Sequence, residues 1–155
     1  MGRFVFLDRD GTVIRDAGYG PRIDDYALLP GAVTGLKRLA AAGFELAIVT
    51  NQSGIGRGYF DEAHYQAFRA HVERDLAARG VTIARSYHCP HAPDAACRCR
   101  KPEPGMLIRA RDELGADLAA SFVIGDKPSD VALAVRDLEQ AADHILATLR
   151  AERDG

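Results

Sequence analysis

The sequence predicts an α/β protein with a parallel, three-layer Rossmann-like sheet that carries helices on both faces. Short apolar runs of strand length alternate along the chain with longer segments whose apolar residues recur at helical spacing. This alternation is typical of parallel strands joined by crossover helices. The length of 155 residues suits one domain, so we expect a single domain over residues 1–155.

Four apolar runs are the expected strands. Residues 4–7 form a short run that ends in Asp8, and residues 44–49 form a second run that leads into Thr50. Continuous apolar runs of this length are typical of strands buried on both faces. Residues 81–87 and 121–124 are the third and fourth expected strands.

Helical spacing predicts the segments between these strands. The expected helices are residues 31–42, 62–79, 106–114, and a segment that starts near residue 128 and runs almost to the end. Asp61 is a good N-cap for the second of them. A glycine follows each of the first three, as expected at a helix end.

Composition excludes several function classes. The hydrophobic content of 47%, the charged content of 27% and the net charge of −2 are those of an ordinary globular protein. No charge excess favours nucleic acid or an anionic membrane, and no apolar run reaches the ~20 residues of a membrane span. The first residues lack the pattern of a signal peptide. We expect a cytoplasmic monomer that binds neither nucleic acid nor membranes.

Polar side chains follow the expected strands at the points where they end. Asp8 follows the first strand, Thr50 the second and Asp126 the last. Ligands of open parallel sheets bind beyond the carboxyl ends of the strands. Residues 9–30, rich in glycine and proline, are expected to be a long functional loop at that edge.

Asp8 and Asp10 are two residues apart at this edge. Carboxylates that share one centre repel each other unless a cation neutralises them, and hard oxygen ligands select Mg²⁺. A pair of solvated loop aspartates explains this short pattern equally well, so the pair alone leaves both interpretations open.

The wider pattern resembles the four motifs of the haloacid dehalogenase superfamily, in the right order. It consists of the run Asp8-Arg9-Asp10-Gly11-Thr12 after an apolar strand, a strand ending in Thr50, the later Lys101, and Gly125-Asp126 with Asp130 four residues on. The resemblance covers about residues 4–137. It implies a phosphatase without a large cap domain.

The resemblance also implies roles for these residues. Asp8 would attack phosphorus and form an aspartyl-phosphate, and Asp10 would act as general acid and then as general base. Thr50 and Lys101 would bind the phosphoryl oxygens. Asp8, the backbone carbonyl of Asp10, and Asp126 would hold Mg²⁺.

Alternatives remain for the single residues. Taken alone, Thr50 is a strand-end hydroxyl and Lys101 a surface lysine. Asp130 is either a partner of the metal's water ligands or an acidic residue favoured by the helix dipole.

A second metal site is predicted between residues 88 and 101. Three thiols and one imidazole fall within eleven residues, an arrangement suited to structural Zn²⁺ rather than to a disulfide framework. The alternative is a set of free thiols beside a loop histidine. His88 is out of phase with the pattern and is not included. The expected ligands are Cys89, His91, Cys97 and Cys99.

Within the superfamily, the cysteine pattern followed by Arg100-Lys101-Pro102 resembles a branch with two activities. One is removal of the 7-phosphate of D-glycero-D-manno-heptose 1,7-bisphosphate, and the other is hydrolysis of histidinol phosphate. Most motifs favour the phosphorylated sugar, whereas the five residues between His91 and Cys97 are as few as in the histidinol-phosphate members. A catalytically idle binding module is the third possibility.

The heptose reading implies a set of substrate-binding residues in the loops at the sheet edge. Arginine suits bidentate contacts to a second phosphate, and Arg57, Arg100 and Lys127 are the candidates for it. The full expected set is Asp16, Ala17, Gly18, Tyr19, Asn51, Gln52, Ser53, Arg57, Arg100 and Lys127.

The C-terminal part departs from the family pattern. Members usually continue after the last motif and its helix with a glycine-containing turn and another strand. Here residues 131–136 run directly into residues 137–140. We expect this turn and strand to be absent near residues 136–138.

Overall fold

The protein is described by a computed structural model over residues 2–101 and 103–125. A four-stranded, fully parallel sheet has the order β3-β2-β1-β4. Its strands are β1 (Phe4–Leu7), β2 (Glu45–Asn51), β3 (Arg85–Cys89) and β4 (Phe122–Ile124). The expected C-terminal helix, Asp126, Lys127, Asp130 and the segment near residues 136–138 lie outside the described residues.

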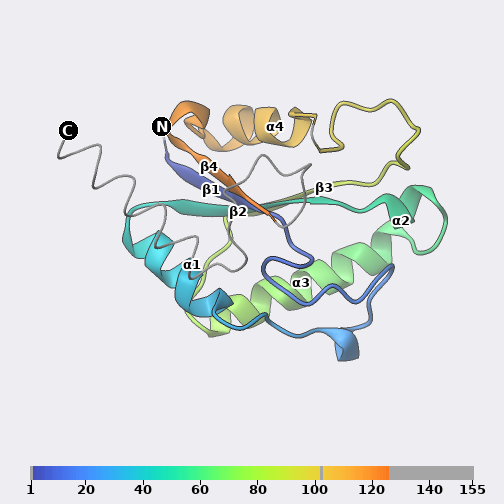
Figure 1. Cartoon of the computed structure of the whole chain (residues 1–155), viewed down its shortest axis with the longest axis horizontal. Helices are drawn as coiled ribbons and strands as arrows, with labels where there is room; N and C mark the ends of the chain where they lie inside the picture. Colours follow the sequence, from blue (N-terminus) through green and yellow to red (C-terminus); the bar gives the residue numbers. More distant parts are fainter. Residues whose placement is uncertain (1, 102, 126–155) are drawn as a thin grey trace.

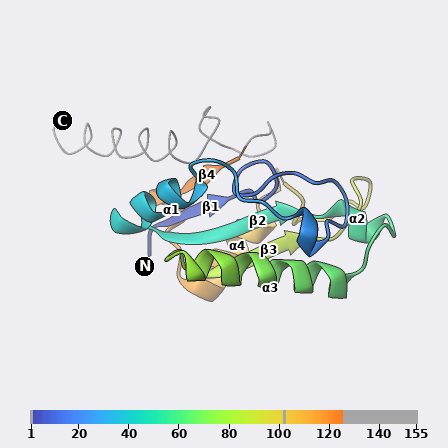
Figure 2. The same ribbon diagram turned by 90° about the horizontal axis from the view of Figure 1, so that it is seen from below.

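Helices cover both faces of this sheet, which confirms the predicted three layers. In Figure 1, α4 lies on one face, and α1 and α3 lie on the other. Figure 2 shows β1, β2 and β3 running side by side toward the end of the molecule that carries α2. The helical segments are η1 (Ile23–Asp25), α1 (Ala32–Ala41), α2 (Ser53–Gly56), α3 (Glu62–Ala78), α4 (Gly105–Leu114) and η2 (Leu118–Ala120).

Two hydrophobic clusters, one on each face, hold the layers together. Val5 and Leu7 of β1 pack into the cluster that includes α1 and α3. Phe4 and Phe6 alternate with them and pack into the cluster that includes Met106 of α4. Successive strand residues point to opposite faces, so burial on both faces requires the continuous apolar run seen in the sequence.

The helix α3 follows its sequence signals closely. Asp61 accepts a hydrogen bond from the backbone N–H of His64 at 2.8 Å, which makes it the N-cap. The buried positions of α3 keep helical spacing and face the sheet. They are Tyr65, Phe68, Val72 and Leu76.

The third strand lies later in the chain than predicted, and this prediction was wrong. The backbone N–H of Val81 still bonds to Leu76 at the end of α3, and strand pairing begins near Ala84, which bonds to Leu46. Val81 is apolar because it is buried in the core, not because it belongs to a strand. Consequently β3 extends to Cys89, and the cysteine loop begins after it rather than at residue 88.

In the glycine-rich segment after β2, Ser53–Gly56 forms one helical turn, α2. The backbone N–H of Gly56 donates to the carbonyl of Pro90 at 2.7 Å. A Cβ at Gly56 would lie only 2.7 Å from that carbonyl. Glycine is therefore needed here for a close approach of two backbones.

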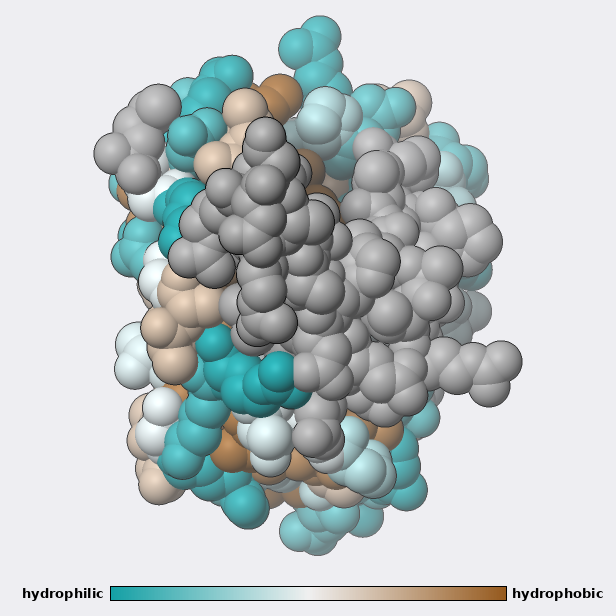
Figure 3. All heavy atoms as spheres, turned by 60° about the vertical axis from the view of Figure 1, so that its left-hand side comes forward, coloured by the Kyte–Doolittle hydropathy of each residue, from teal (hydrophilic) through white to brown (hydrophobic). Residues whose placement is uncertain are grey.

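None of the helices among the described residues is long and apolar enough to cross a membrane. On the face shown in Figure 3, the visible described surface is mainly hydrophilic, with apolar residues in smaller areas between the polar ones.

Candidate active site

The predicted site forms where the strands end. In Figure 1, α2, the loop after β1 and the loop after β3 gather at this end of the sheet. The backbone N–H of Asp8 bonds to the carbonyl of Ile124 at 2.9 Å. The ends of β1 and β4 are thus adjacent, and the described chain reaches Gly125 beside Asp8.

Asp8 and Lys101 form a buried ion pair at the bottom of the site. Lys101 Nζ lies 3.0 Å from Asp8 Oδ1, and the two residues are only 9% and 4% exposed. The side chain of Asn51, at the end of β2, holds the backbone of Lys101. Asn51 Oδ1 accepts from the Lys101 N–H at 2.9 Å, and Asn51 Nδ2 donates to the Lys101 carbonyl at 3.4 Å. The strand end therefore fixes the position of a lysine 93 residues away from Asp8 in sequence.

Asp10 lies in a hydrogen-bond network with Thr50. Gln52 Nε2 donates to Asp10 Oδ2 at 3.1 Å and to Thr50 Oγ1 at 2.9 Å. Arg9 adds two hydrogen bonds to the Asp10 carboxylate. The structure thus brings together all four residues predicted to be catalytic, as the Asp8–Lys101 pair and the Asp10–Thr50 network.

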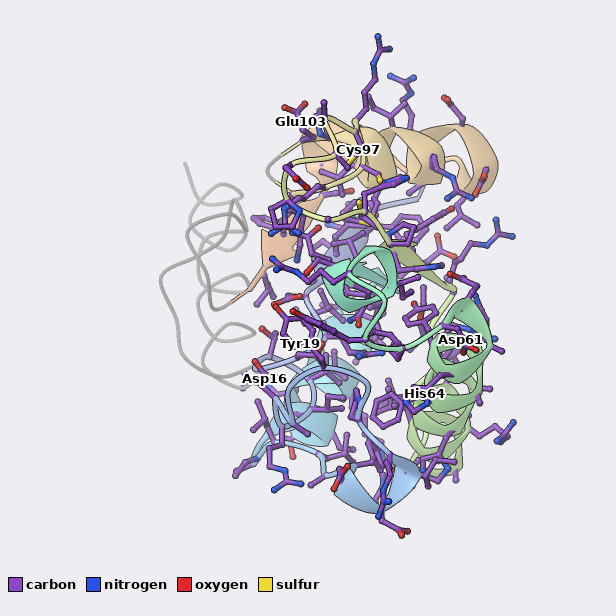
Figure 4. The ribbon with its side chains drawn as sticks, turned by 90° about the vertical axis from the view of Figure 1, so that its right-hand side faces the viewer. Asp16, Tyr19, Asp61, His64, Cys97 and Glu103 are labelled. Atoms are coloured by element: carbon purple, nitrogen blue, oxygen red, sulfur yellow. The ribbon has the colours of Figure 1, made fainter. Side chains whose placement is uncertain are left out.

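A cavity of about 380 Å³ is lined by Asp10 and by the sequence neighbours of Thr50 and Lys101, whereas Asp8, Thr50 and Lys101 do not line it. Ala17, predicted to bind substrate, is exposed and does not line it. Figure 4 looks onto this end of the molecule, with Asp16 and Tyr19 on one side of α2 and Cys97 on the other. The lining residues come from three segments of the chain. They are Asp10, Asp16, Gly18, Tyr19, Asn51, Gln52, Ser53, Arg57 and Arg100.

Several of these lining residues also shape the cavity wall. Asp16 Oδ1 accepts from the Gly18 N–H at 3.0 Å, which fixes a turn of the loop. The Arg57 guanidinium lies 5.9 Å from the centre of the Tyr19 ring. Arg57 and Arg100 both line the cavity, together with the carboxylates of Asp10 and Asp16.

The four predicted zinc ligands converge as expected. Their ligand atoms all lie within 4.8 Å of one another, and none of the three cysteines forms a disulfide. Cys89 Sγ is 3.6 Å from Cys97 Sγ, and His91 Nδ1 is 3.3 Å from Cys99 Sγ. Two sulfurs on one tetrahedral zinc lie about 3.8 Å apart. The Cys89–Cys97 distance is close to this value, whereas Cys89 Sγ and Cys99 Sγ lie 2.7 Å apart and would have to separate to bind the same Zn²⁺.

The thiols of this cluster differ in acidity. Burial acts to raise the pKa of Cys97, but hydrogen bonds, the largest from the Arg100 backbone, outweigh it and lower the pKa to about 6. Burial raises the pKa of Cys89 to about 12. Thiolates are the metal-binding form, so a bound metal has to displace the Cys89 proton.

His88 is not part of this cluster, as predicted. Its Nε2 lies 2.7 Å from Glu62 Oε1, and its ring stacks on Tyr65 with 4.0 Å between the centroids. His88 therefore ties β3 to α3.

Two features of the site were not predicted from the sequence. Arg9 was taken only as part of a motif, yet its side chain contacts Asp10. Asn51 and Gln52 were assigned to the substrate, whereas their amides also hold Lys101, Asp10 and Thr50. No sequence signal shows which partner a side-chain amide takes.

The chain is similar to several known proteins. A HAD-hydrolase-like family model matches residues 98–137. A D-glycero-beta-D-manno-heptose-1,7-bisphosphate 7-phosphatase of Photorhabdus laumondii is 47% identical over 134 residues, covering 82% of this chain and 71% of that protein. The alpha-anomer enzyme of the same organism is 40% identical over 136 residues, with 83% and 74% covered.

A solved structure has the same fold. It is the D,D-heptose 1,7-bisphosphate phosphatase of B. bronchiseptica in complex with magnesium and phosphate, with 29% identity and a TM-score of 0.81. The match covers 94% of this chain and 99% of that one. Fold and site thus define a HAD-like phosphatase. Within that class, the chain belongs to the family of the D-glycero-D-manno-heptose-1,7-bisphosphate 7-phosphatases.

Proposed function

We propose that this protein is a magnesium-dependent phosphatase that removes the 7-phosphate of D-glycero-D-manno-heptose 1,7-bisphosphate through an aspartyl-phosphate. The observation that carries the proposal is the buried Asp8–Lys101 pair, together with a cavity that Asp10 and two arginines line. The relatives named for this activity support it.

The first half-reaction transfers the phosphoryl group to the enzyme. A carboxylate oxygen of Asp8 forms a bond to phosphorus, and the bond between phosphorus and the sugar oxygen breaks. Asp10 gives its proton to the departing alkoxide. Lys101 and Thr50 stabilise the charge on the phosphoryl oxygens while the phosphoryl group passes from the sugar oxygen to Asp8.

The second half-reaction frees the enzyme. Asp10, now a carboxylate, takes a proton from water, and the water oxygen attacks phosphorus. The bond between phosphorus and Asp8 breaks, which releases inorganic phosphate and restores both carboxyl groups to their starting forms.

Asp8, the backbone carbonyl of Asp10, and Asp126 are the proposed holders of Mg²⁺. The donor set is all oxygen, as Mg²⁺ prefers. When bound, the ion neutralises the negative charge that Asp8 and the phosphate would otherwise share. The adjacency of Asp8 and Gly125 supports the assignment of Asp126, and the complex of the B. bronchiseptica relative supports that of Mg²⁺.

The arginines that line the cavity support a substrate with two phosphates. Arg57 and Arg100, with Lys127 as the third candidate, are proposed to bind the phosphate that is not cleaved. Histidinol phosphate has a cationic amine instead, which two arginines repel. It remains the second candidate because of the short loop between His91 and Cys97.

A rate comparison tests this proposal. Purified protein with Mg²⁺ is expected to release phosphate from the heptose bisphosphate faster than from histidinol phosphate. The assay includes both anomers of the sugar, because the relatives include enzymes named for each. Equal or reversed rates on the two substrate classes would overturn the substrate assignment.

The control for chemistry is Asp8→Asn, which keeps the side-chain shape and removes the nucleophile. It is expected to lose activity by on the order of a thousandfold or more. A wild-type protein that releases no phosphate from any of these substrates would instead be a binding module.

The Cys₃His cluster is proposed to hold a structural Zn²⁺. Four protein ligands leave no position open for water, and the loop leads directly into Arg100 and Lys101. The cytoplasmic location, the monomeric state and the absence of nucleic-acid binding stay predictions.

A further inference from the structure

The carboxylate of Asp10 is held from two sides. Arg9 donates from Nε to Oδ1 at 3.0 Å and from Nη2 to Oδ2 at 3.2 Å, the geometry of a bidentate contact. Gln52 Nε2 donates to Oδ2 at 3.1 Å. Three donors fix the plane and the direction of this carboxylate before any substrate is bound.

Arg9 is an unusual residue to find in this position. It is 3% exposed, and its guanidinium lies 5.7 Å from the ring centre of Tyr65 and 5.0 Å from that of Phe68. Its Nη1 is buried and has no hydrogen-bond partner within the described part of the chain. An arginine is costly to bury and to leave partly unsatisfied. An apolar side chain of similar length would fit the aromatic surroundings as well.

The second contact connects two parts of the site. The same Gln52 Nε2 that donates to Asp10 also donates to Thr50 Oγ1 at 2.9 Å. Gln52 is 6% exposed. The amide therefore fixes the distance between the acid–base group and the hydroxyl proposed to bind the phosphoryl group.

We propose that Arg9 and Gln52 are positioning residues that aim Asp10 at the leaving-group oxygen. The proposal rests on the proposed phosphatase function. Arg9 acts through Asp10, because its two hydrogen bonds hold the Asp10 carboxylate in one orientation. The advantage gained is in catalysis and not in folding stability.

This role predicts a dependence on the leaving group. A sugar alkoxide is a poor leaving group and needs a proton as the bond to phosphorus breaks. The p-nitrophenolate ion leaves without one. Damage to the positioning of Asp10 should therefore slow hydrolysis of a sugar phosphate much more than hydrolysis of p-nitrophenyl phosphate.

The test is Arg9→Met, assayed on the heptose bisphosphate and on p-nitrophenyl phosphate. We expect kcat on the sugar phosphate to fall by about ten- to a hundredfold, less than the roughly 10²–10⁴-fold that general acid catalysis supplies, because Asp10 itself remains. On the aryl phosphate, the single-turnover rate of aspartyl-phosphate formation should change less than about threefold. That step needs no general acid when p-nitrophenolate is the leaving group. The midpoint of thermal unfolding is measured for each variant, which separates a loss of stability from a selective loss of rate.

Arg3→Met is the matched control. Arg3 also lies over an aromatic ring, with 4.7 Å to the centre of Phe44, and donates to the carbonyl of Ala42. It stands before β1, whereas Arg9 follows that strand. Its replacement should leave both rates unchanged.

Two further variants complete the test. Arg9→Lys keeps the positive charge but not the bidentate contact, so it should recover only part of the lost rate. Gln52→Met should show the same preference for loss on the sugar phosphate. Measuring formation of the aspartyl-phosphate in single turnovers keeps the later general-base step from masking the difference.

Equal losses on the two substrates, or a lower unfolding midpoint with no selective loss, would overturn the inference. Wild-type protein that releases phosphate from neither substrate would instead refute the proposed function. The two failures are therefore distinguishable by the wild-type rates.

Discussion

At the scale of single residues, the buried Asp8–Lys101 pair is central to the proposed chemistry. The two charges lie 3.0 Å apart and almost out of contact with water. The attraction between charges is stronger there than at the surface. A lysine in this position offsets the negative charge of Asp8 and is close enough to contact a phosphoryl group bound to it.

Replacement of Lys101 by methionine tests this arrangement. We expect kcat to fall by about a hundredfold or more, as for loss of one donor that stabilises transition-state charge. Steady-state rates measure this, and circular dichroism checks the fold. Lys37→Met, at an exposed position of α1, is the control and should change nothing. A Lys101 variant with near-normal kcat would remove the lysine from the mechanism.

The arginines that line the cavity make a separate residue-scale prediction. Arg57→Met and Arg100→Met should each raise KM for the bisphosphate by about tenfold, because a charge-assisted hydrogen bond contributes about 1.5–3 kcal/mol. KM for a heptose carrying only the 7-phosphate should change little. If both substrates were affected equally, the arginines would contact the phosphate that is cleaved.

At the scale of elements, the loop after β3 positions Arg100 and Lys101. Its cysteine ligands precede Lys101 directly, and the backbone N–H of Gly105 bonds to the carbonyl of Arg98 at 2.9 Å. A Cβ at Gly105 would lie 2.3 Å from that carbonyl. Close backbone contacts and the Cys₃His cluster hold this loop, and Cys97 and Cys99 pack against the hydrophobic cluster on the α4 face.

Loss of zinc should therefore reduce activity through Arg100 and Lys101. Cys97→Ser is expected to lower the zinc content, measured by elemental analysis, and to lower kcat and raise KM together. Asp94→Asn, at an exposed position of the same loop, is the control. A zinc-free variant with normal kinetics would show that the cluster does not support the site.

At the scale of the whole molecule, the loop after β1 is joined to α3 by Tyr26 and Asp75. Tyr26 Oη donates to Asp75 Oδ2 at 2.5 Å, across 49 residues of sequence. The Tyr26 ring also makes edge contacts with Phe68 and His71. The hydrogen bond from Tyr26, helped by Arg79, lowers the pKa of Asp75.

This contact should make stability depend on pH. A lowered carboxyl pKa adds stability above the unfolded value of about 3.9, and the contribution is lost as pH falls through the folded value. Tyr26→Phe should reduce the free energy of unfolding by about 1 kcal/mol at pH 7. The difference should shrink below about pH 4. Urea unfolding at several pH values measures it, and a difference that stays constant would contradict the assignment.

Much of this architecture was predictable from local patterns. The apolar run at residues 4–7, the N-cap at Asp61 and the spacing of buried residues in α3 were read correctly, because each depends on neighbours in sequence. The order of the motifs was sufficient to predict the family, which is confirmed. The clustering of the four cysteine and histidine ligands was predictable because all lie within eleven residues.

Other features depended on contacts between distant segments. The apolar residues near Val81 predicted a strand, but they are apolar because α1 and α3 bury them, and pairing with β2 starts β3 later. Asn51 holds Lys101 across 50 residues.

The sequence by itself determined which chemical groups stand at the strand ends, since strand periodicity and motif order are local properties of the chain. Only the tertiary structure decided that Arg9 and Gln52 hold Asp10. The reason is that the direction of a buried side chain depends on which donors, acceptors and rings the folded chain brings around it.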